Sequence, residues 1–159
     1  MHRTIFFLLS ALFFTIIPAS AQDITAVSDT LQADSVQADR PFRVTLYSPD
    51  AHITLALDLY EESVNVPGYE FFGPTFGYMR GDARQWMYGV WFVLSAEIKE
   101  NKAILRMSND SGAASQDVEL RIMPDGTYAY RALGTNEVSR AEGRKLKKIQ
   151  TKMTFIKQQ

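Results

Sequence analysis

The sequence has no cysteine and almost no histidine, and both shortages narrow the chemistry available to the chain. Without cysteine it has no disulfide framework, no thiol nucleophile, no cysteine-ligated zinc or iron–sulfur site and no lipobox cysteine to acylate. The two histidines are His2 and His52. His2 belongs to an N-terminal leader, so a Ser/His/Asp relay would need His52, and a site with two histidine ligands is excluded.

An excess of charge of either sign is also missing. The 159 residues carry a net charge of -1, with 46% hydrophobic and 22% charged residues, which is typical of one globular domain. Such a balance differs from that of a disordered or nucleic-acid-coating chain. We therefore expect no nucleic-acid partner.

Long apolar runs are limited to residues 5–17, near the N-terminus. This run follows Arg3 and precedes the small-x-small sequence Ala19-Ser20-Ala21, the pattern of a secretory signal peptide. It is shorter than the roughly 20 residues that a membrane-spanning helix needs. We interpret residues 1–21 as a signal peptide cleaved after Ala21, and expect an exported protein, periplasmic or extracellular, that does not span the membrane.

Residues 22–40 form a second segment of distinct composition. They are rich in Ser, Thr, Gln and Ala, contain no aromatic residue, and have aspartate at positions 23, 29, 34 and 39. We interpret them as a flexible acidic leader; the alternative is a short helix with one aliphatic face. Residues 41–159 are then expected to form a single all-β domain.

From Pro41 onward the apolar residues alternate with a period of two, which predicts half-buried strands. The clearest run is 53–59, and Pro49-Asp50 before it predicts a turn from an earlier strand at 42–47. Further strands are expected in 86–100 and 102–108. Pro124-Asp125-Gly126 predicts a tight hairpin between strands 117–123 and 127–133.

The stretch 145–157 fits both helical and strand spacing, and we favour a strand because Thr, Ile and Phe prefer strands and Gly143 precedes it. The predicted fold is therefore an antiparallel sandwich or small barrel of about eight strands. Gly89-Val90-Trp91 resembles the G-x-W motif that opens the first strand of lipocalin barrels. In lipocalins that motif lies near the start of the domain, so we do not assign the family.

The most unusual segment is 66–92, which holds both tryptophans and most of the aromatic residues of the mature chain, together with five glycines. We expect a long, folded-back loop over 67–88. Its rings either fill a satellite core or present an apolar platform to a ligand. The candidate ligand-binding residues are Tyr69, Tyr78, Arg80, Asp82, Arg84 and Trp86.

Motifs for catalysis or metal binding are weak. His52 lies two residues from Asp50, but a histidine in a turn at a strand end explains it better, and the adjacent carboxylates Glu61 and Glu62 point to opposite faces of a strand. Residues 108–112 lack the spacing of a calcium loop and fit a polar turn. We therefore name no catalytic residue, no metal ligand and no cofactor. Basic residues crowd 139–157, and we expect them to protect a sheet edge from aggregation.

These features predict an exported, non-enzymatic β-domain that binds a glycan, a small apolar or lipid-like ligand, or an envelope protein through the aromatic loop. The alternative is a structural or accessory component of the cell envelope. A carbohydrate-active enzyme with Glu70 and Asp82 as paired carboxylates is a third possibility.

Overall fold

The computed structural model describes residues 40–83 and 87–158. The predicted signal peptide and nearly all of the acidic leader lie outside these residues, as do Arg84 and Trp86. Within the described chain the only helical element is the short 3-10 turn η1 (Glu70–Phe72). The strands are β1 (Arg43–Ser48), β2 (Ile53–Asp58), β3 (Gly77–Gly81), β4 (Trp91–Lys99), β5 (Lys102–Asn109), β6 (Ser115–Ile122), β7 (Tyr128–Leu133), β8 (Ser139–Glu142), β9 (Lys145–Lys148) and β10 (Lys152–Lys157).

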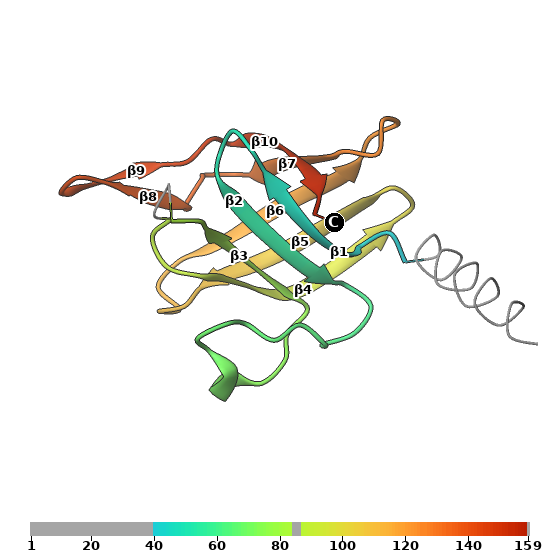
Figure 1. Cartoon of the computed structure of the whole chain (residues 1–159), viewed down its shortest axis with the longest axis horizontal. Helices are drawn as coiled ribbons and strands as arrows, with labels where there is room; N and C mark the ends of the chain where they lie inside the picture. The colour runs from blue at the N-terminus through green and yellow to red at the C-terminus, as the bar shows by residue number, and fades with distance from the viewer. Residues whose placement is uncertain (1–39, 84–86, 159) are drawn as a thin grey trace, which may run out of the picture. The chain divides into compact units, whose positions relative to one another are not determined.

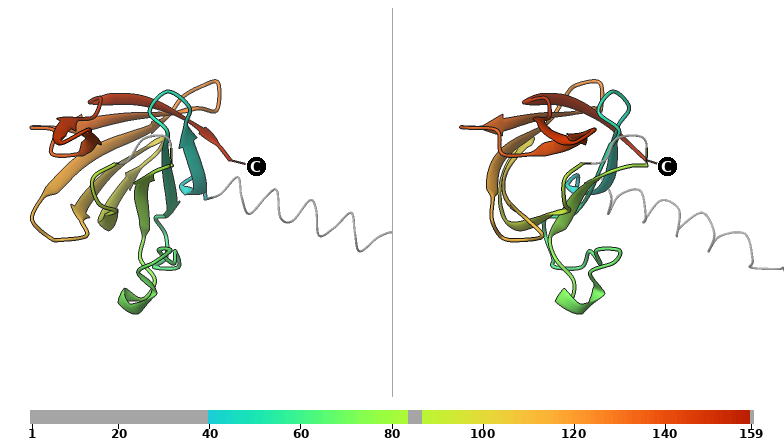
Figure 2. Two further views of the ribbon diagram at one scale, coloured as in Figure 1. Left: turned by 60° about the vertical axis from the view of Figure 1, so that its left-hand side comes forward. Right: turned by 90° about the vertical axis from the view of Figure 1, so that its left-hand side faces the viewer.

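Eight of the described strands form a closed antiparallel barrel in the order β1-β10-β7-β6-β5-β4-β3-β2 (Figures 1 and 2). Consecutive strands from β1 to β7 are neighbours, and β10 closes the barrel between β7 and β1. The prediction of an all-β small barrel is confirmed. Closure removes the free sheet edges that an open meander of this length would expose.

The predicted hairpins form where turn residues separate alternating strands. Around Pro124-Asp125-Gly126, the amide of Gly126 donates to the carbonyl of Met123 at 2.9 Å, and the Asp125 carboxylate accepts from the amide and hydroxyl of Thr127 at 2.9 and 2.7 Å. In β2, Ile53, Leu55 and Leu57 face the interior, as the period of two requires.

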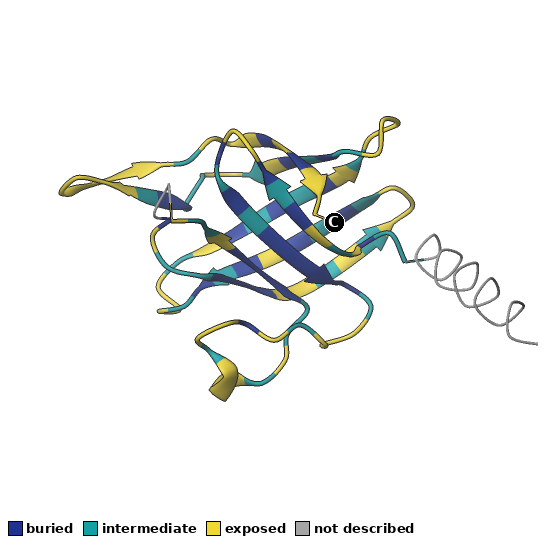
Figure 3. Ribbon diagram, viewed as in Figure 1, coloured by how far each residue is buried: buried dark blue, intermediate teal, exposed yellow. Residues whose placement is uncertain are grey.

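Large side chains fill the barrel interior, as the buried stripes along the strands show (Figure 3). The Tyr128 ring packs edge-on against Phe42, and its hydroxyl donates to the carbonyl of Pro41 at 2.6 Å. The largest fully buried side chains are Trp91, Tyr128, Tyr130, Phe42, Phe155, Leu46, Leu55, Met79, Leu105, Met107, Leu120 and Gln116.

The C-terminal stretch 145–157 is extended, as favoured, but it forms two strands with different roles. β9 pairs with β8 in a separate two-stranded sheet, whereas β10 pairs with β7 and β1 in the barrel wall. The expectation that basic residues protect a sheet edge on the last strand is therefore wrong for Lys152 and Lys157, because β10 has a neighbour on each side. The expectation agrees with β9, which pairs with β8 alone and whose residues are all exposed.

The expectation of a continuous loop over 67–88 is also wrong, because β3 lies inside it. Gly77 and Tyr78 pair with β2, and a Cβ atom at Gly77 would lie 2.3 Å from the Ala56 carbonyl oxygen. Only glycine allows the two backbones to approach this closely. Among the described residues, no helix is both long and apolar enough to cross a membrane.

Candidate functional site

The chain between β2 and β3 crosses the outer surface of the barrel. It leaves β2 at Asp58, whose buried carboxylate accepts hydrogen bonds from the Ser63 hydroxyl at 2.6 Å and the Tyr60 amide at 3.2 Å. It returns through a bridge between Val64 and Thr75. The segment thereby encloses a second, smaller apolar cluster on the outside of the wall, formed by Ala56, Val66, Tyr78 and Phe92 with Val64, Tyr69 and Val90 packed against it.

At its outer end this segment presents three aromatic rings, Tyr69, Phe71 and Phe72, which we call the aromatic tip. Phe71 and Phe72 are 77% and 58% exposed and lie with ring centroids 4.4 Å apart. The Phe72 ring stacks on Tyr69 with an interplanar angle of 13° and meets the buried Phe92 edge-on at 5.6 Å. The exposed pair is therefore supported from below by the outer apolar cluster, and the tip projects from the barrel (Figures 1 and 2).

Two polar contacts hold the aromatic tip in place. The Tyr69 hydroxyl donates to the Asp110 carboxylate in the β5–β6 turn at 2.5 Å, and this hydrogen bond, together with burial, raises the pKa of the phenol. A Cβ at Gly89 would lie 2.6 Å from Oδ1 of Asp110, so glycine there leaves room for the carboxylate. The Gly68 amide donates to the Glu70 carboxylate at 2.9 Å, which lowers the pKa of Glu70.

The structure divides the predicted ligand-binding residues between two places. Tyr69 belongs to the aromatic tip, whereas Tyr78 is 8% exposed in the outer apolar cluster beneath it, with the guanidinium of Arg80 5.6 Å from its ring centroid. Asp82 follows the other end of β3 and joins a different cluster. Arg84 and Trp86 lie outside the described residues.

Sequence reasoning missed Phe71 and Phe72 as site residues, although both belong to the segment it singled out. Two adjacent apolar rings in a strand would point to opposite faces, and one would be buried. In η1 neither residue is buried. The signal that could have found them is the pair Glu70 and Gly73 on either side, because a charged residue and a glycine enclose too short a run for a strand.

Asp82 forms a cluster with Tyr47 and His52. The Tyr47 hydroxyl lies 2.9 Å from Nδ1 of His52 and donates to Oδ2 of Asp82 at 2.8 Å, and Nδ1 lies 3.6 Å from the same carboxylate oxygen. Because the Tyr47 hydroxyl gives its proton to the hydrogen bond with Asp82, its oxygen must accept the hydrogen bond with His52. Nδ1 of His52 is then the donor. His52 lies in the turn before β2 with a φ of 54°, so the interpretation as a turn histidine holds.

The other candidate acid–base residues do not assemble into a catalytic pair. Glu61 makes an ion pair with Arg40, and Glu70 and Asp82 precede and follow opposite ends of β3. Residues 108–112 span the end of β5 and the start of its polar turn to β6, where Asn109 Oδ1 accepts from the Ala114 amide at 3.0 Å. Within residues 40–83 and 87–158, no three His, Asp or Glu side chains are grouped to hold a metal ion.

The fold and this surface define the class of protein: an up-and-down antiparallel β-barrel with a filled interior and an aromatic tip held on its outer wall. No protein-family model, no curated protein and no solved structure matches the chain.

Proposed function

We propose that this chain is an exported, non-enzymatic binding protein that contacts a partner protein through the aromatic tip. The observation that carries the proposal is the exposure of two adjacent phenylalanines, Phe71 and Phe72, on a turn held by Tyr69 and Asp110. Burying a phenylalanine side chain contributes roughly 1.5–3 kcal/mol. Two rings that are already ordered lose little conformational entropy on binding, as in the anchor residues of protein interfaces.

The chemistry of the aromatic tip favours a protein over the other two ligand classes. Phe71 and Phe72 carry no hydrogen-bonding atom, and the neighbouring Glu70 carboxylate is already bonded to the Gly68 amide. A sugar site needs convergent polar groups beside its stacking ring. A lipid-like ligand enclosed in the barrel would have to displace Trp91, Tyr128 and other large packed side chains.

The test is site-specific photocrosslinking of the full chain in its own cells, with p-benzoylphenylalanine at position 71. The matched control places the same group at Leu94, a residue of β4 that is 56% exposed at the bulge between Val93 and Ser95. We expect a discrete protein adduct from position 71 and none from position 94. The Phe72→Ser change should remove that adduct, because it removes the second anchor ring.

Three results would count against a protein partner. Adducts of equal yield at both positions would show that contact is nonspecific. Absence of any protein adduct at position 71 would leave the tip without a protein ligand. Retention of the wild-type chain on a glycan array, lost in a Phe71→Ser/Phe72→Ser variant, would assign the tip to a glycan instead.

A partner that stays attached through purification would favour the alternative role of an accessory envelope component. In that case the partner would cover the aromatic tip permanently, instead of binding and dissociating repeatedly. The two roles are separated by the dissociation rate of the partner that crosslinking identifies, measured on the non-crosslinked complex when it is mixed with an excess of free protein.

A further inference from the structure

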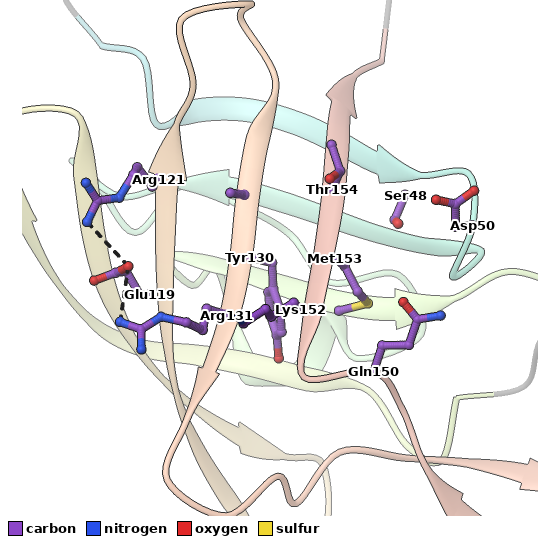
Figure 4. Close-up of a pocket in the computed structure, with 11 residues that line it drawn as sticks. Ser48, Asp50, Glu119, Arg121, Tyr130, Arg131, Gln150, Lys152, Met153 and Thr154 are labelled. Carbon is purple, nitrogen blue, oxygen red and sulfur yellow. Dashed lines mark ion pairs between the residues drawn. The ribbon is translucent and has the colours of Figure 1, made fainter.

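The barrel wall has a pocket of about 330 Å³ where β6, β7 and β10 meet the end of β1 (Figure 4). None of the residues of the aromatic tip lines it. It exists because the closing seam is short. β1 pairs with β10 only at Leu46 with Lys157 and Tyr47 with Ile156, so the end of β1 and the turn after it diverge from the first half of β10. The volume is near the lower end of the range for small-molecule sites.

Two buried hydroxyl groups at this pocket have no hydrogen-bond partner. Ser48 is fully buried and Tyr130 is 1% exposed, and both residues line the pocket. Among the described residues, three buried side-chain polar atoms lack a partner, and Ser48 Oγ and Tyr130 Oη are two of them. In Figure 4 the Ser48 hydroxyl points from β1 toward the side of the pocket that Met153 and Gln150 form. Native proteins rarely leave such groups unbonded. Tyr130 packs in the core against Phe155, so of the two hydroxyls it is that of Ser48 which offers a contact to a ligand in the pocket.

The other side of the pocket is a fixed pair of arginines. Oε1 of Glu119 lies 3.3 Å from Nη2 of Arg131 and 3.5 Å from Nη2 of Arg121, and Oε2 lies 4.0 Å from Nζ of Lys102. Burial acts to raise the pKa of Glu119, but the hydrogen bond and charge of Arg131, with Arg121 and Lys102, outweigh it and lower the pKa. One carboxylate thus orients several cations, and each guanidinium keeps further N–H donors for a ligand.

The balance of donors and acceptors defines what the pocket can hold. Arg121, Arg131 and Lys152 offer positive charge, and the Ser48 hydroxyl can donate. The carboxylate of Glu119 is engaged by cations, whereas Asp50, beside Ser48, and Gln150 both lie across the pocket from the arginines (Figure 4). One side therefore suits an oxyanion and the other suits hydroxyl groups.

We propose that this pocket binds a sugar acid, a polyhydroxylated carboxylic acid of monosaccharide size. Arg121, Arg131 and Lys152 contact the carboxylate, and Asp50 with Gln150 accepts and donates hydrogen bonds to the ring hydroxyls. The Ser48 hydroxyl becomes a ligand contact instead of an unpaired group. This site is separate from the aromatic tip. The protein would then have two binding sites, the pocket for a small ligand and the aromatic tip for a partner protein.

The test measures binding of D-glucuronate to the full chain by isothermal titration calorimetry, with D-glucose as the neutral analogue and inorganic sulfate as the simple oxyanion. We expect saturable binding of glucuronate that is at least about tenfold tighter than that of glucose or sulfate, because charge and hydroxyl contacts act together. Raising the salt concentration should weaken it.

Variants locate the site. Lys152→Gln should weaken glucuronate binding by about tenfold or more while leaving the Glu119 network intact, since Lys152 is outside it. Lys157→Gln, on the same strand but away from this pocket, is the matched control and should change binding less than about twofold. Ser48→Ala should weaken binding without loss of folding, because the native hydroxyl has no partner to lose.

Several outcomes would overturn the proposal. No saturable heat up to about 10 mM glucuronate, a far weaker affinity than a small-molecule site should have, would remove the site. Equal binding of glucose would show that charge is not recognised, and equal binding of sulfate would replace the sugar acid by a simple anion site. Equal effects of Lys152→Gln and Lys157→Gln would place the ligand elsewhere. None of these results bears on the aromatic tip, which is tested separately by crosslinking.

Discussion

Replacing Gly77 by alanine should destabilise the domain strongly, because β3 approaches β2 too closely for a side chain. The added Cβ would lie 2.3 Å from the Ala56 carbonyl oxygen and 2.9 and 3.1 Å from Cδ2 and Cα of Leu57. Ordinary contacts begin near 3.4 Å, so β3 must move by about 1 Å. Overpacking of this kind costs roughly 1–3 kcal/mol, and a weakened ladder bond adds about 1 kcal/mol. We expect a loss of about 3 kcal/mol in the free energy of unfolding.

The assay is urea unfolding followed by circular dichroism, with Gly112→Ala as the control. Gly112 also has a positive φ, 70°, but no atom lies within 4 Å of its added Cβ, so alanine there should cost only about 1–2 kcal/mol of backbone strain. A Gly77→Ala midpoint no lower than that of Gly112→Ala would refute the steric argument. It would mean that β2 and β3 separate freely.

Three further changes probe the loop and the charged network. Tyr69→Phe should lower the unfolding free energy by about 1 kcal/mol at neutral pH; because the folded pKa of Tyr69 is raised, the difference should shrink as pH rises above about 10, seen in urea midpoints against pH. Phe71→Ser with Phe72→Ser should lower stability by about 1–2 kcal/mol, because Phe72 loses its contacts with Tyr69 and Phe92, and should reduce binding of an apolar dye measured by fluorescence. Glu119→Gln should lower stability by at most about 1 kcal/mol. Because folding lowers the pKa of Glu119, its ionised carboxylate stabilises the fold above about pH 4.3, and this contribution is lost as the pH falls through the pKa of the folded state. The free energy of unfolding of the variant should therefore fall less steeply as the pH is lowered.

Most strands could be predicted because large apolar residues on the inward face alternate with smaller or polar residues on the outward face. In 102–108 buried residues alternate with less buried ones, and in 53–58 Ile53, Leu55 and Leu57 alternate with Thr54, Ala56 and Asp58, so the period of two is visible in the sequence. β3 was missed because Tyr78 and Met79 are both buried, one under the outer segment and one inside the barrel. Large apolar residues in succession hide the alternation of a strand, and the glycines at its two ends imitate a loop.

The sequence indicates the segment that holds the candidate site but not which of its residues are exposed, because exposure depends on contacts between residues distant in sequence. The aromatic composition marked the right segment, but the exposure of Phe71 depends on how far that segment stands from the barrel. Barrel closure has no local signature either, because it pairs β1 with β10. The wall pocket combines residues from β1, β6, β7 and β10, none of which belongs to a recognisable motif.

The pairing of the first strand with the last also constrains the order in which the barrel can form. The hairpins from β4 to β7 join residues close in sequence, and such contacts form early. β1 has its neighbour β2 from the start, but its other edge stays unpaired until residues 152–158 have left the ribosome and the Gln158 amide can reach the Thr45 carbonyl. Until then the nascent barrel is an open sheet with two free edges, on β1 and β7, the form most prone to pairing with another chain. The pairing of β10 with β1 and β7 is therefore the step that separates closure of the barrel from pairing of its open sheet with another chain.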